Sequence, residues 1–365
     1  MTRPDRVLHV AHFVAPHVGG LETVVAAETR ALADRGWTVT VVSSAVGARA
    51  GTRTEGGVRT VRVRAWNGLE HRFGVPFPVF SPRLLTTLGR EVRRADVVHV
   101  HDTLYVTSWV AALCCLALRT PYVVHRHVGF VHHSSALVRL VQWVVLATFG
   151  RLVLAGARRV LPIDAHIAAT LPDASRVEVL GNGVDTARFH PRPHESHPRP
   201  VVLFVGRFVP KKGFDLVAAA AGDDYDITFA GGSRPPGVDD PRLHFLGSVP
   251  ATEMPEVYAR ADVMVVASIG ECPLTVLEAM ASGLPVLLRD DPALRSPWTA
   301  GPGVRFVDMA GGELASAIRE TIADPDALRR TGAAGRDFVL ERFSWDVHVD
   351  RLESVYRTEL EQVSN

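Results

Sequence analysis

Short runs of apolar residues alternate with stretches of helical periodicity along almost the entire chain. This alternation is typical of β-α-β units, in which a helix crosses over between two neighbouring parallel strands. A helical stretch over 21–35, ended by Gly36, follows the first apolar run. The runs centre on Val7, Val39, Val61, Val97, Tyr122, Val160, Val177, Val201, Ile227, Leu243, Val263 and Val286. We therefore predict an α/β protein built on parallel sheets.

The length of 365 residues exceeds the range of a single hydrophobic core, so two domains are expected. The segment 190–200 has four prolines and no apolar periodicity, which is typical of a stiff, exposed linker. We place the boundary there, with an N-terminal domain over 1–192 and a C-terminal domain over 198–344. A final amphipathic helix over 345–365 is indicated by apolar residues at helical spacing: Trp345, Val349, Leu352, Tyr356 and Leu360.

One segment of the second half carries two cations directly after a predicted strand. Five apolar residues, 201–205, predict a buried strand, and Arg207 and Lys212 follow it in a loop. A planar guanidinium and a compact ammonium at the carboxyl edge of a parallel sheet suit a diphosphate. Each cation alone would more often be a solvated loop charge.

A second segment combines a helix start with two carboxylates. A short helix is predicted over 273–282, because Pro273 suits the first turn and Gly283 suits the position just past the end. Its first amides, around Leu274 and Thr275, would face an anion, with the positive end of the helix dipole behind them. Glu278 or Glu271 could bind sugar hydroxyls while the other lies near a reacting carbon. Alone, the segment fits a buried helix with a glycine cap equally well.

Several strings in a fixed order resemble the family-four (group 1) glycosyltransferases, which are retaining enzymes that use nucleotide sugars. The resemblance covers nearly the whole length of the chain. It rests on P-H-V-G-G-L-E at 16–22, D-V-V-H-V-H-D at 96–102, G-N-G-V-D-T-A-R-F-H-P at 181–191, G-R-F-V-P-K-K-G-F-D at 206–215 and L-E-A-M-A-S-G-L-P-V at 277–286. It implies the GT-B fold, in which the parallel sheets of two Rossmann-like domains face an interdomain cleft and the C-terminal helix packs on the first domain.

The resemblance also implies where substrates bind. The second domain would hold the nucleotide-sugar donor through Arg207, Lys212 and the start of the helix, and the first domain would hold a hydroxyl acceptor. His127 would contact the donor sugar and assist at the reaction centre, since a strand ends near His125. A hydrogen-bonded loop histidine is the alternative for His127.

The chain departs from the family pattern at the first of two glutamates that the family has at its reaction site. The family has two glutamates with seven residues between them, and the position eight before Glu278 is Gly270, with Glu271 one place later. We expect Glu271 to supply the missing carboxylate, although the sugar hydroxyl could be recognised differently. Gly19 and Gly20 would let the backbone approach the donor phosphate or the acceptor, or simply allow a tight turn.

No metal or cofactor is expected beyond the nucleotide-sugar co-substrate. No Asp-x-Asp pair has a suitable context, and the adjacent acidic pairs at 239–240 and 290–291 are interpreted as loop or cap residues, with a bound cation as the minority alternative. Sixteen histidines are enough for a zinc cluster in number, but their spacing fits no zinc motif.

The overall charge and the cysteines limit partners and location. A net charge of +1 gives no field that would favour nucleic acid. Three cysteines form neither a disulfide framework nor a zinc spacing, which suits the cytoplasm. The apolar stretch 136–160 is interrupted by arginines, so we expect a helix packed inside the first domain, or one lying on the inner face of a membrane. Such peripheral contact would fit a lipid-linked acceptor.

The resulting hypothesis is a metal-independent, retaining glycosyltransferase that acts on a glycan, glycolipid or small molecule. Two alternatives remain open. A sugar-nucleotide epimerase or hydrolase would convert the donor without an acceptor. A nucleotide-sugar-binding subunit would bind the donor without transferring it. A nicotinamide-dependent dehydrogenase is a third and weaker alternative, because the dinucleotide-binding motif G-x-G-x-x-G does not follow the first strand.

Overall fold

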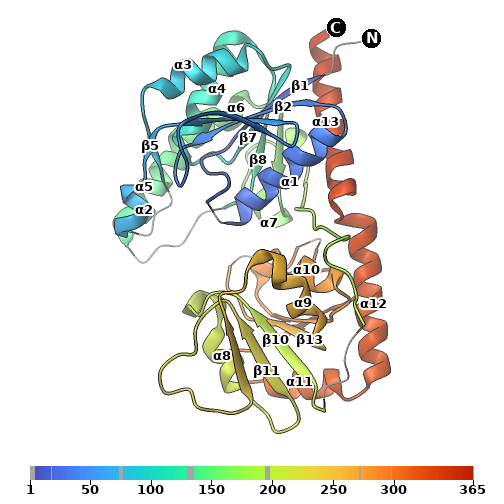
Figure 1. Ribbon diagram of the computed structural model, residues 1–365. Coiled ribbons are helices and arrows are strands. Elements are labelled where there is room, and N and C mark those ends of the chain that lie inside the picture. Colours follow the sequence, from blue (N-terminus) through green and yellow to red (C-terminus); the bar gives the residue numbers. More distant parts are fainter. Residues whose placement is uncertain are drawn as a thin grey trace. The chain divides into compact units, whose positions relative to one another are not determined.

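The chain divides into two compact units, each built around its own sheet (Figure 1). The computed structural model describes residues 5–17, 19–73, 77–129, 135–193, 198–270, 273–296 and 298–364. The N-terminal unit comprises Met1–Gly181 and His348–Asn365, and the C-terminal unit comprises Asn182–Val347. The predicted α/β class and the two-domain organisation are confirmed.

The N-terminal unit contains a seven-stranded sheet with the order β3-β4-β2-β1-β7-β8-β9, parallel except for the β3–β4 pair. Six of the predicted strands are present, and the predicted strand near Val177 is only a single bridge to Val160. The strands are β1 (Arg6–Val10), β2 (Thr38–Ser44), β3 (Gly51–Glu55), β4 (Val58–Val63), β7 (Val97–His101), β8 (Tyr122–Arg126) and β9 (Arg159–Pro162), with a separate antiparallel pair of β5 (Ala65–Trp66) and β6 (Val79–Phe80).

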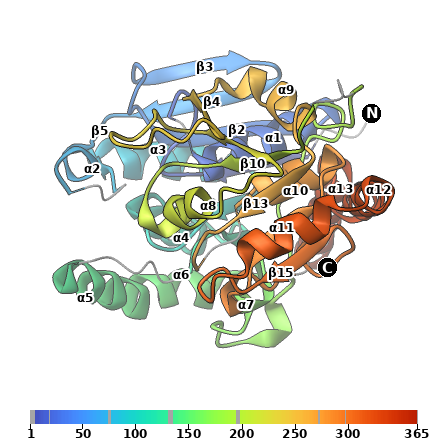
Figure 2. The ribbon, with the colours of Figure 1, turned by 90° about the horizontal axis from the view of Figure 1, so that it is seen from below.

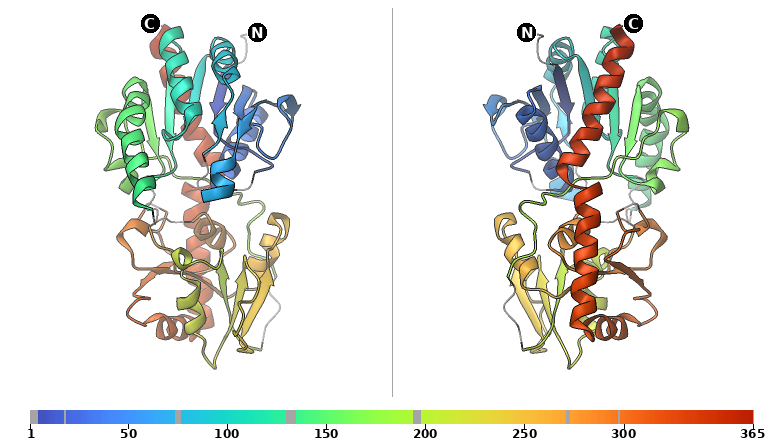
Figure 3. Two further views of the ribbon diagram at one scale, coloured as in Figure 1. Left: turned by 90° about the vertical axis from the view of Figure 1, so that its left-hand side faces the viewer. Right: turned by 90° about the vertical axis from the view of Figure 1, so that its right-hand side faces the viewer.

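Alternating residues of these strands face two different helix layers. Leu8, Val98 and Val124 pack with α3, α4 and α6 on one face. On the other face, strand residues of the opposite parity pack with α1 and with α13, whose course is visible in Figure 3. The helices of this unit are α1 (Gly20–Asp34), α2 (Gly68–Phe73), α3 (Arg83–Val92), α4 (Val106–Leu118), α5 (Ala136–Val145), α6 (Arg151–Gly156), α7 (Ala165–Ala168) and the greater part of α13 (Trp345–Ser364).

The C-terminal unit contains a six-stranded, fully parallel sheet with the order β12-β11-β10-β13-β14-β15. The chain runs outward from β10 in one direction and from β13 in the other, which makes the edge beside these two strands a topological switch point. All five predicted strands are present, and β15 was not predicted. The strands are β10 (Val201–Val205), β11 (Asp226–Ala230), β12 (Leu243–Gly247), β13 (Val263–Val266), β14 (Val286–Arg289) and β15 (Val304–Val307).

Helices cover both faces of this second sheet. Phe214 and Val217 of α8 share one apolar cluster with Leu314 and Ile318 of α11, so α8 and α11 lie on the same face (Figure 2). The helices are α8 (Phe214–Ala219), α9 (Met254–Ala259), α10 (Thr275–Ala281), α11 (Leu314–Ile322) and α12 (Pro325–Arg342).

The boundary between the units lies after Gly181, so the predicted boundary in the proline-rich segment is wrong. Val184 explains the shift, because its N–H donates to the carbonyl of Phe343 over 2.8 Å and its carbonyl accepts from the N–H of Trp345 over 3.2 Å. These bonds attach the stretch that follows Gly181 to the C-terminal unit. The last helix is present as predicted, and its part from His348 onward belongs to the N-terminal unit.

The apolar helical run 136–156 is mostly exposed. It consists of α5, a π-helical segment (Leu146–Gly150) and α6. By length and composition it could cross a membrane, yet only 22% of its most apolar window is buried. The prediction of a packed helix holds for Val153 and Leu154 of α6 and is wrong for α5. The exposed apolar side chains of α5 are Leu137, Leu140, Val141, Trp143 and Val144.

Candidate active site

The loop after β10 carries the two predicted cations at the carboxyl edge of the C-terminal sheet. Arg207 is exposed, and Lys212 ends a 3₁₀ turn, Pro210–Lys212. The carbonyl of Lys211 accepts a hydrogen bond from the N–H of Ile269 over 2.9 Å. Because Ile269 follows β13, this bond ties the loop that carries the cations to the loop that leads into α10.

Gly213 allows the loop to come this close to β13. Its φ is +72°, and a Cβ there would lie 2.5 Å from the carbonyl oxygen of Ala267. Any other residue would be strained by the backbone conformation and would also collide with the end of the neighbouring strand. Glycine at this position therefore lets the loop that carries Lys212 pack against the residues that directly follow β13.

The predicted helix is α10, which begins two residues later than expected. Leu274 is its N-cap and Thr275 its first residue, so Pro273 precedes the helix. The hydroxyl oxygen of Thr275 is buried and makes no hydrogen bond with a described residue. At the other end, Gly283 has a φ of +81°, the left-handed conformation expected of a glycine after the last turn.

Glu278 lies inside the unit and is held by a neighbouring helix. The buried Tyr258 of α9 donates a hydrogen bond from Oη to Glu278 Oε2 over 2.7 Å. Burial raises the pKa of Glu278, and the Tyr258 bond and the charge of Arg188 oppose that rise. Oε1 accepts no hydrogen bond from a described residue, so it is available to a hydroxyl group of a ligand.

The position of the family's first glutamate has its own backbone requirement. Gly270 has a φ of +76°, and its N–H donates to Oδ2 of Asp291 over 3.1 Å. A glutamate would be strained in this conformation, which gives a physical reason for the departure. Glu271 and Cys272 lie outside the described residues, so the role of Glu271 stays a prediction.

Three of the four carboxylates in the adjacent acidic pairs, those of Asp240, Asp290 and Asp291, have local partners. Asp290 accepts from Arg295 over 2.7 Å, and Asp291 also caps the short turn at Ala293. Asp240 receives two side-chain bonds and one backbone bond from Arg242. These carboxylates act as loop and cap residues.

In the N-terminal unit, the predicted glycines lie at the start of α1. Gly19 is the N-cap, with an extended φ of −173°, and Gly20 is the first helical residue. A Cβ at Gly20 would meet no atom within 4 Å, and one at Gly19 would contact only the flexible end of Glu22. Packing among the described residues therefore does not demand glycine at either position.

His127 follows β8 at the carboxyl edge of the N-terminal sheet, where the sequence placed it. Its Nε2 lies 3.1 Å from Nδ1 of His101, and its ring centroid lies 4.0 Å from that of His125. Burial, followed by the charges of His125 and His101, lowers the pKa of His127 well below its ordinary value. The imidazole is therefore neutral near pH 7.

Sequence reasoning did not single out Asp102, which ends the H-V-H-D string after β7. It has a φ of +64°, an uncommon conformation for a residue other than glycine. Burial raises the pKa of Asp102 to about 6, although the nearby Arg126 opposes the rise. A strained, buried carboxyl at a strand's carboxyl end is typical of functional positions, and its place after an apolar strand was the available signal.

Two doubly wound α/β units, the second with cations and a partly buried glutamate at its switch point, define a protein of the GT-B class. The family model described as "Glycosyltransferase Family 4" matches residues 18–188, and the one described as "Glycosyl transferases group 1" matches residues 199–324. The chain belongs to this family of glycosyltransferases, as its motifs predicted.

Individual proteins agree with this assignment. A glycogen synthase of Mycobacterium tuberculosis is 29% identical over 298 residues, covering 72% of this chain and 69% of that protein. A GDP-mannose-dependent alpha-mannosyltransferase of Mycolicibacterium smegmatis is 35% identical over 208 residues, covering 51% of this chain and 52% of the relative. The fold is similar to that of sucrose-phosphate synthase from Thermosynechococcus elongatus, with a TM-score of 0.75 at 21% identity, covering 98% of this chain and 100% of that one.

Proposed function

We propose that the protein is a retaining glycosyltransferase that moves a hexosyl group from a nucleotide-diphosphate sugar to a hydroxyl acceptor. The observation that carries this proposal is the position of Arg207, Lys212 and Glu278. They come from segments that follow β10 and β13, two strands that pair directly in one parallel sheet. A diphosphate and a sugar at that edge would meet two cations and one carboxylate.

The chemistry requires stabilisation of the charge that builds on the departing phosphate. Arg207 and Lys212 oppose that charge directly. The acceptor oxygen attacks the anomeric carbon on the face from which the phosphate leaves. A bond forms between that oxygen and the anomeric carbon, and the bond between the anomeric carbon and the phosphate oxygen breaks. Because attack and departure occur on the same face, the configuration is retained. The departing phosphate takes the acceptor's proton. His127, neutral at pH 7, would contact the sugar and assist at that centre.

No metal at the diphosphate is part of this proposal. The two cations supply the positive charge that a bridging ion would otherwise provide, and the nucleotide sugar is the co-substrate. Leu274 and Thr275 would add backbone contacts, and Glu271 would supply the second carboxylate. Gly19 and Gly20 would allow the backbone of the N-terminal unit to approach a substrate, since no packing contact among the described residues accounts for Gly20.

A binding subunit without transfer activity is the second candidate. It is favoured by Gly270, whose left-handed backbone stands where the family has a glutamate. Such a protein would bind the donor as tightly but would transfer no sugar to any acceptor. Single-turnover assays with a panel of acceptors separate the two candidates.

We further propose a cytoplasmic protein that touches the inner face of an anionic membrane and uses a lipid-linked acceptor. The support is α5, whose apolar side chains are exposed. Arg139 and Arg151 border the uncharged stretch between them, which suits a helix lying at an anionic headgroup layer.

A thermal-shift screen of nucleoside diphosphates and nucleotide sugars tests the donor site. A ligand at one hundred times its dissociation constant should stabilise the protein by about 2.7 kcal/mol. Arg207→Ala and Lys212→Ala should abolish the shift, whereas Lys211→Ala, which removes the neighbouring exposed lysine, should keep most of it. Equal shifts in all three variants would place the donor elsewhere.

A further inference from the structure

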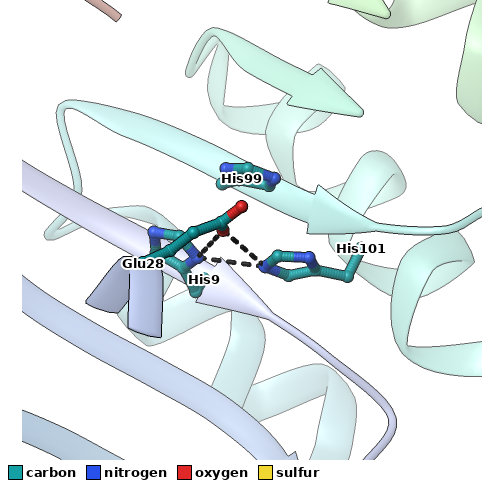
Figure 4. Close-up of side chains that lie close together, drawn as sticks. All are labelled: His9, Glu28, His99 and His101. Atoms are coloured by element: carbon teal, nitrogen blue, oxygen red, sulfur yellow. Dashed lines mark hydrogen bonds and ion pairs between the residues drawn. The ribbon is translucent and has the colours of Figure 1, made fainter. Parts of the chain in front are cut away.

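A group of histidines shares one buried face of the N-terminal sheet. His9 on β1 is the register partner of His99 on β7, and His101 on β7 is the partner of His125 on β8. Paired residues of a parallel sheet point to the same face, and alternate residues of one strand do so too. Glu28 of α1 lies over this face, and Figure 4 shows its carboxylate among the rings of His9, His99 and His101. All of these side chains are fully buried.

Three of the atoms form a triangle of the size that surrounds a metal ion. His9 Nδ1 and His101 Nε2 are 3.0 Å apart, and each lies 3.8 Å from Glu28 Oε2. An ion equidistant from them would lie about 2 Å from each, which is the usual length of zinc–nitrogen and zinc–oxygen bonds. His99 offers a fourth ligand atom, and all four atoms lie within 4.8 Å of one another.

Two atoms of this group have no hydrogen-bond partner among the described residues. They are Oε2 of Glu28 and Nε2 of His99. A buried carboxylate oxygen without a donor is costly, and such atoms are rare in folded proteins. Glu28 Oε2 is also the corner of the triangle that faces both ring nitrogens, so a cation there would compensate for the missing bonds.

The protonation states suit metal ligands. Burial lowers the pKa of His9 to about 4, and burial lowers the pKa of His99 and of His101 well below the ordinary value. These rings are therefore neutral at pH 7 and offer lone pairs. Burial alone would raise the pKa of Glu28, but contacts from His125 and His348 hold it well below its usual range. The set thus offers three neutral nitrogens and one anionic oxygen, a combination that zinc and neighbouring first-row ions accept.

Outer contacts hold the candidate ligands in place. Nδ1 of His101 lies 3.1 Å from Nε2 of His127, and Nε2 of His9 lies 3.5 Å from Oη of Tyr356. Nε2 of His348 lies 2.9 Å from the other oxygen of Glu28. Histidine ligands of metals usually have their second ring nitrogen held in this way, which fixes the tautomer and aims the lone pair.

We propose that His9, Glu28, His99 and His101 bind one divalent transition-metal ion of the zinc type in the interior of the N-terminal unit. Four protein ligands leave no position for a substrate, so the ion is structural and joins α1 to β1 and β7. This site is separate from the diphosphate site, whose residues belong to the C-terminal unit, and it does not depend on the proposed transfer reaction.

Cobalt is the probe that tests this site, because it absorbs visible light when bound by four ligands. Tag-free full-length protein is treated with a chelator, dialysed and titrated with Co²⁺, and the bound metal is also counted by mass spectrometry. We expect about one Co²⁺ per chain, displacement by Zn²⁺ and a higher melting temperature in the loaded protein. Uptake below about a tenth of an equivalent by the wild-type protein overturns the proposal, and leaves a metal-free hydrogen-bonded histidine network as the explanation of the cluster.

Variants locate the ion. His101→Asn and Glu28→Gln should each lose the cobalt absorption, while His166→Asn, at an exposed histidine of α7, should retain it. Circular dichroism shows whether each variant is folded. A folded His101→Asn protein that binds Co²⁺ as the wild type does contradicts the site. If both variants fail to fold, the number of Co²⁺ ions bound per wild-type chain and the visible absorption of the loaded wild-type protein decide whether the site exists.

Discussion

Tyr258 of α9 holds Glu278 of α10 by donating a 2.7 Å hydrogen bond inside the C-terminal unit. Tyr258→Phe should leave Oε2 of the partly buried Glu278 without its donor, costing about 1–2 kcal/mol of unfolding free energy and weakening nucleotide binding. Urea titration and the nucleotide thermal shift measure the two effects. Tyr225→Phe is the matched control, because Tyr225 is also fully buried but bonds a backbone carbonyl, at Ala220. The Tyr225→Phe variant should lose stability but keep the nucleotide-induced thermal shift. Equal nucleotide-induced shifts in both variants would mean that Tyr258 does not contribute to donor binding.

The raised pKa of Glu278 predicts a pH-dependent effect of Glu278→Gln. A carboxyl whose pKa is raised by folding contributes stability that is complete below its ordinary value of 4.5 and is lost as the pH rises through the raised value. Removing the carboxyl should therefore leave stability near pH 4 unchanged and increase it near pH 8, while nucleotide binding weakens.

Urea titrations followed by tryptophan fluorescence at both pH values measure this difference. Glu341→Gln, at an exposed position on α12, is the control and should show no pH-dependent gain. A Glu278→Gln protein that is less stable than the wild type at pH 8 but not at pH 4 would mean that folding favours the ionised carboxylate.

Gly213→Ala should be strongly destabilising. The left-handed backbone costs a non-glycine residue about 1–2 kcal/mol. A Cβ only 2.5 Å from the carbonyl of Ala267 adds a collision, for which a further 1–3 kcal/mol is a rough expectation. Gly237→Ala, at a φ of +79° with no atom within 4 Å of the new Cβ, isolates the backbone cost. Chemical denaturation of both variants should show the larger loss at Gly213. Equal losses would mean that the loop yields to the methyl group.

Gly20→Ala tests whether the glycine at this position is needed for stability or for sugar transfer. The position is helical and open, so alanine should leave the stability unchanged or raise it by up to about 1 kcal/mol. If the backbone approaches a substrate there, sugar transfer should fall by about tenfold or more, because a misplaced substrate loses its reactive geometry. Gly89→Ala, at a similarly open position in α3, should raise stability without changing transfer. Unchanged transfer in Gly20→Ala would leave helix initiation as the role of this glycine.

The exposed face of α5 predicts binding to anionic vesicles. Trp143→Glu should reduce co-sedimentation with phosphatidylglycerol vesicles several-fold, because it removes apolar area and adds a charge that the lipids repel. Leu246→Glu, at a half-exposed leucine on β12, should bind as the wild type does. If the wild-type protein binds neutral vesicles as well as it binds anionic ones, the arginines that border the apolar stretch do not contribute to membrane binding.

The segments that the sequence located correctly are those governed by local rules. The strand over 201–205 and the end of α10 before Gly283 follow from apolar runs and turn residues a few positions apart. The strand β15 was not predicted because Arg305 interrupts its short apolar run. The exposure of α5 could not be inferred, because apolar periodicity is the same for a helix that packs on a core and one that does not.

By itself, the amino-acid sequence determined the α/β class, the position of Arg207 and Lys212 after a buried strand, and the family. Only the tertiary structure decided that the stretch after Gly181 belongs to the second unit, and that Glu28 lies among His9, His99 and His101. The physical reason is the pairing of β1 with β7, which brings residues about ninety positions apart into register on one face of a sheet. The spacing of residues within one segment does not show which distant strand that segment pairs with.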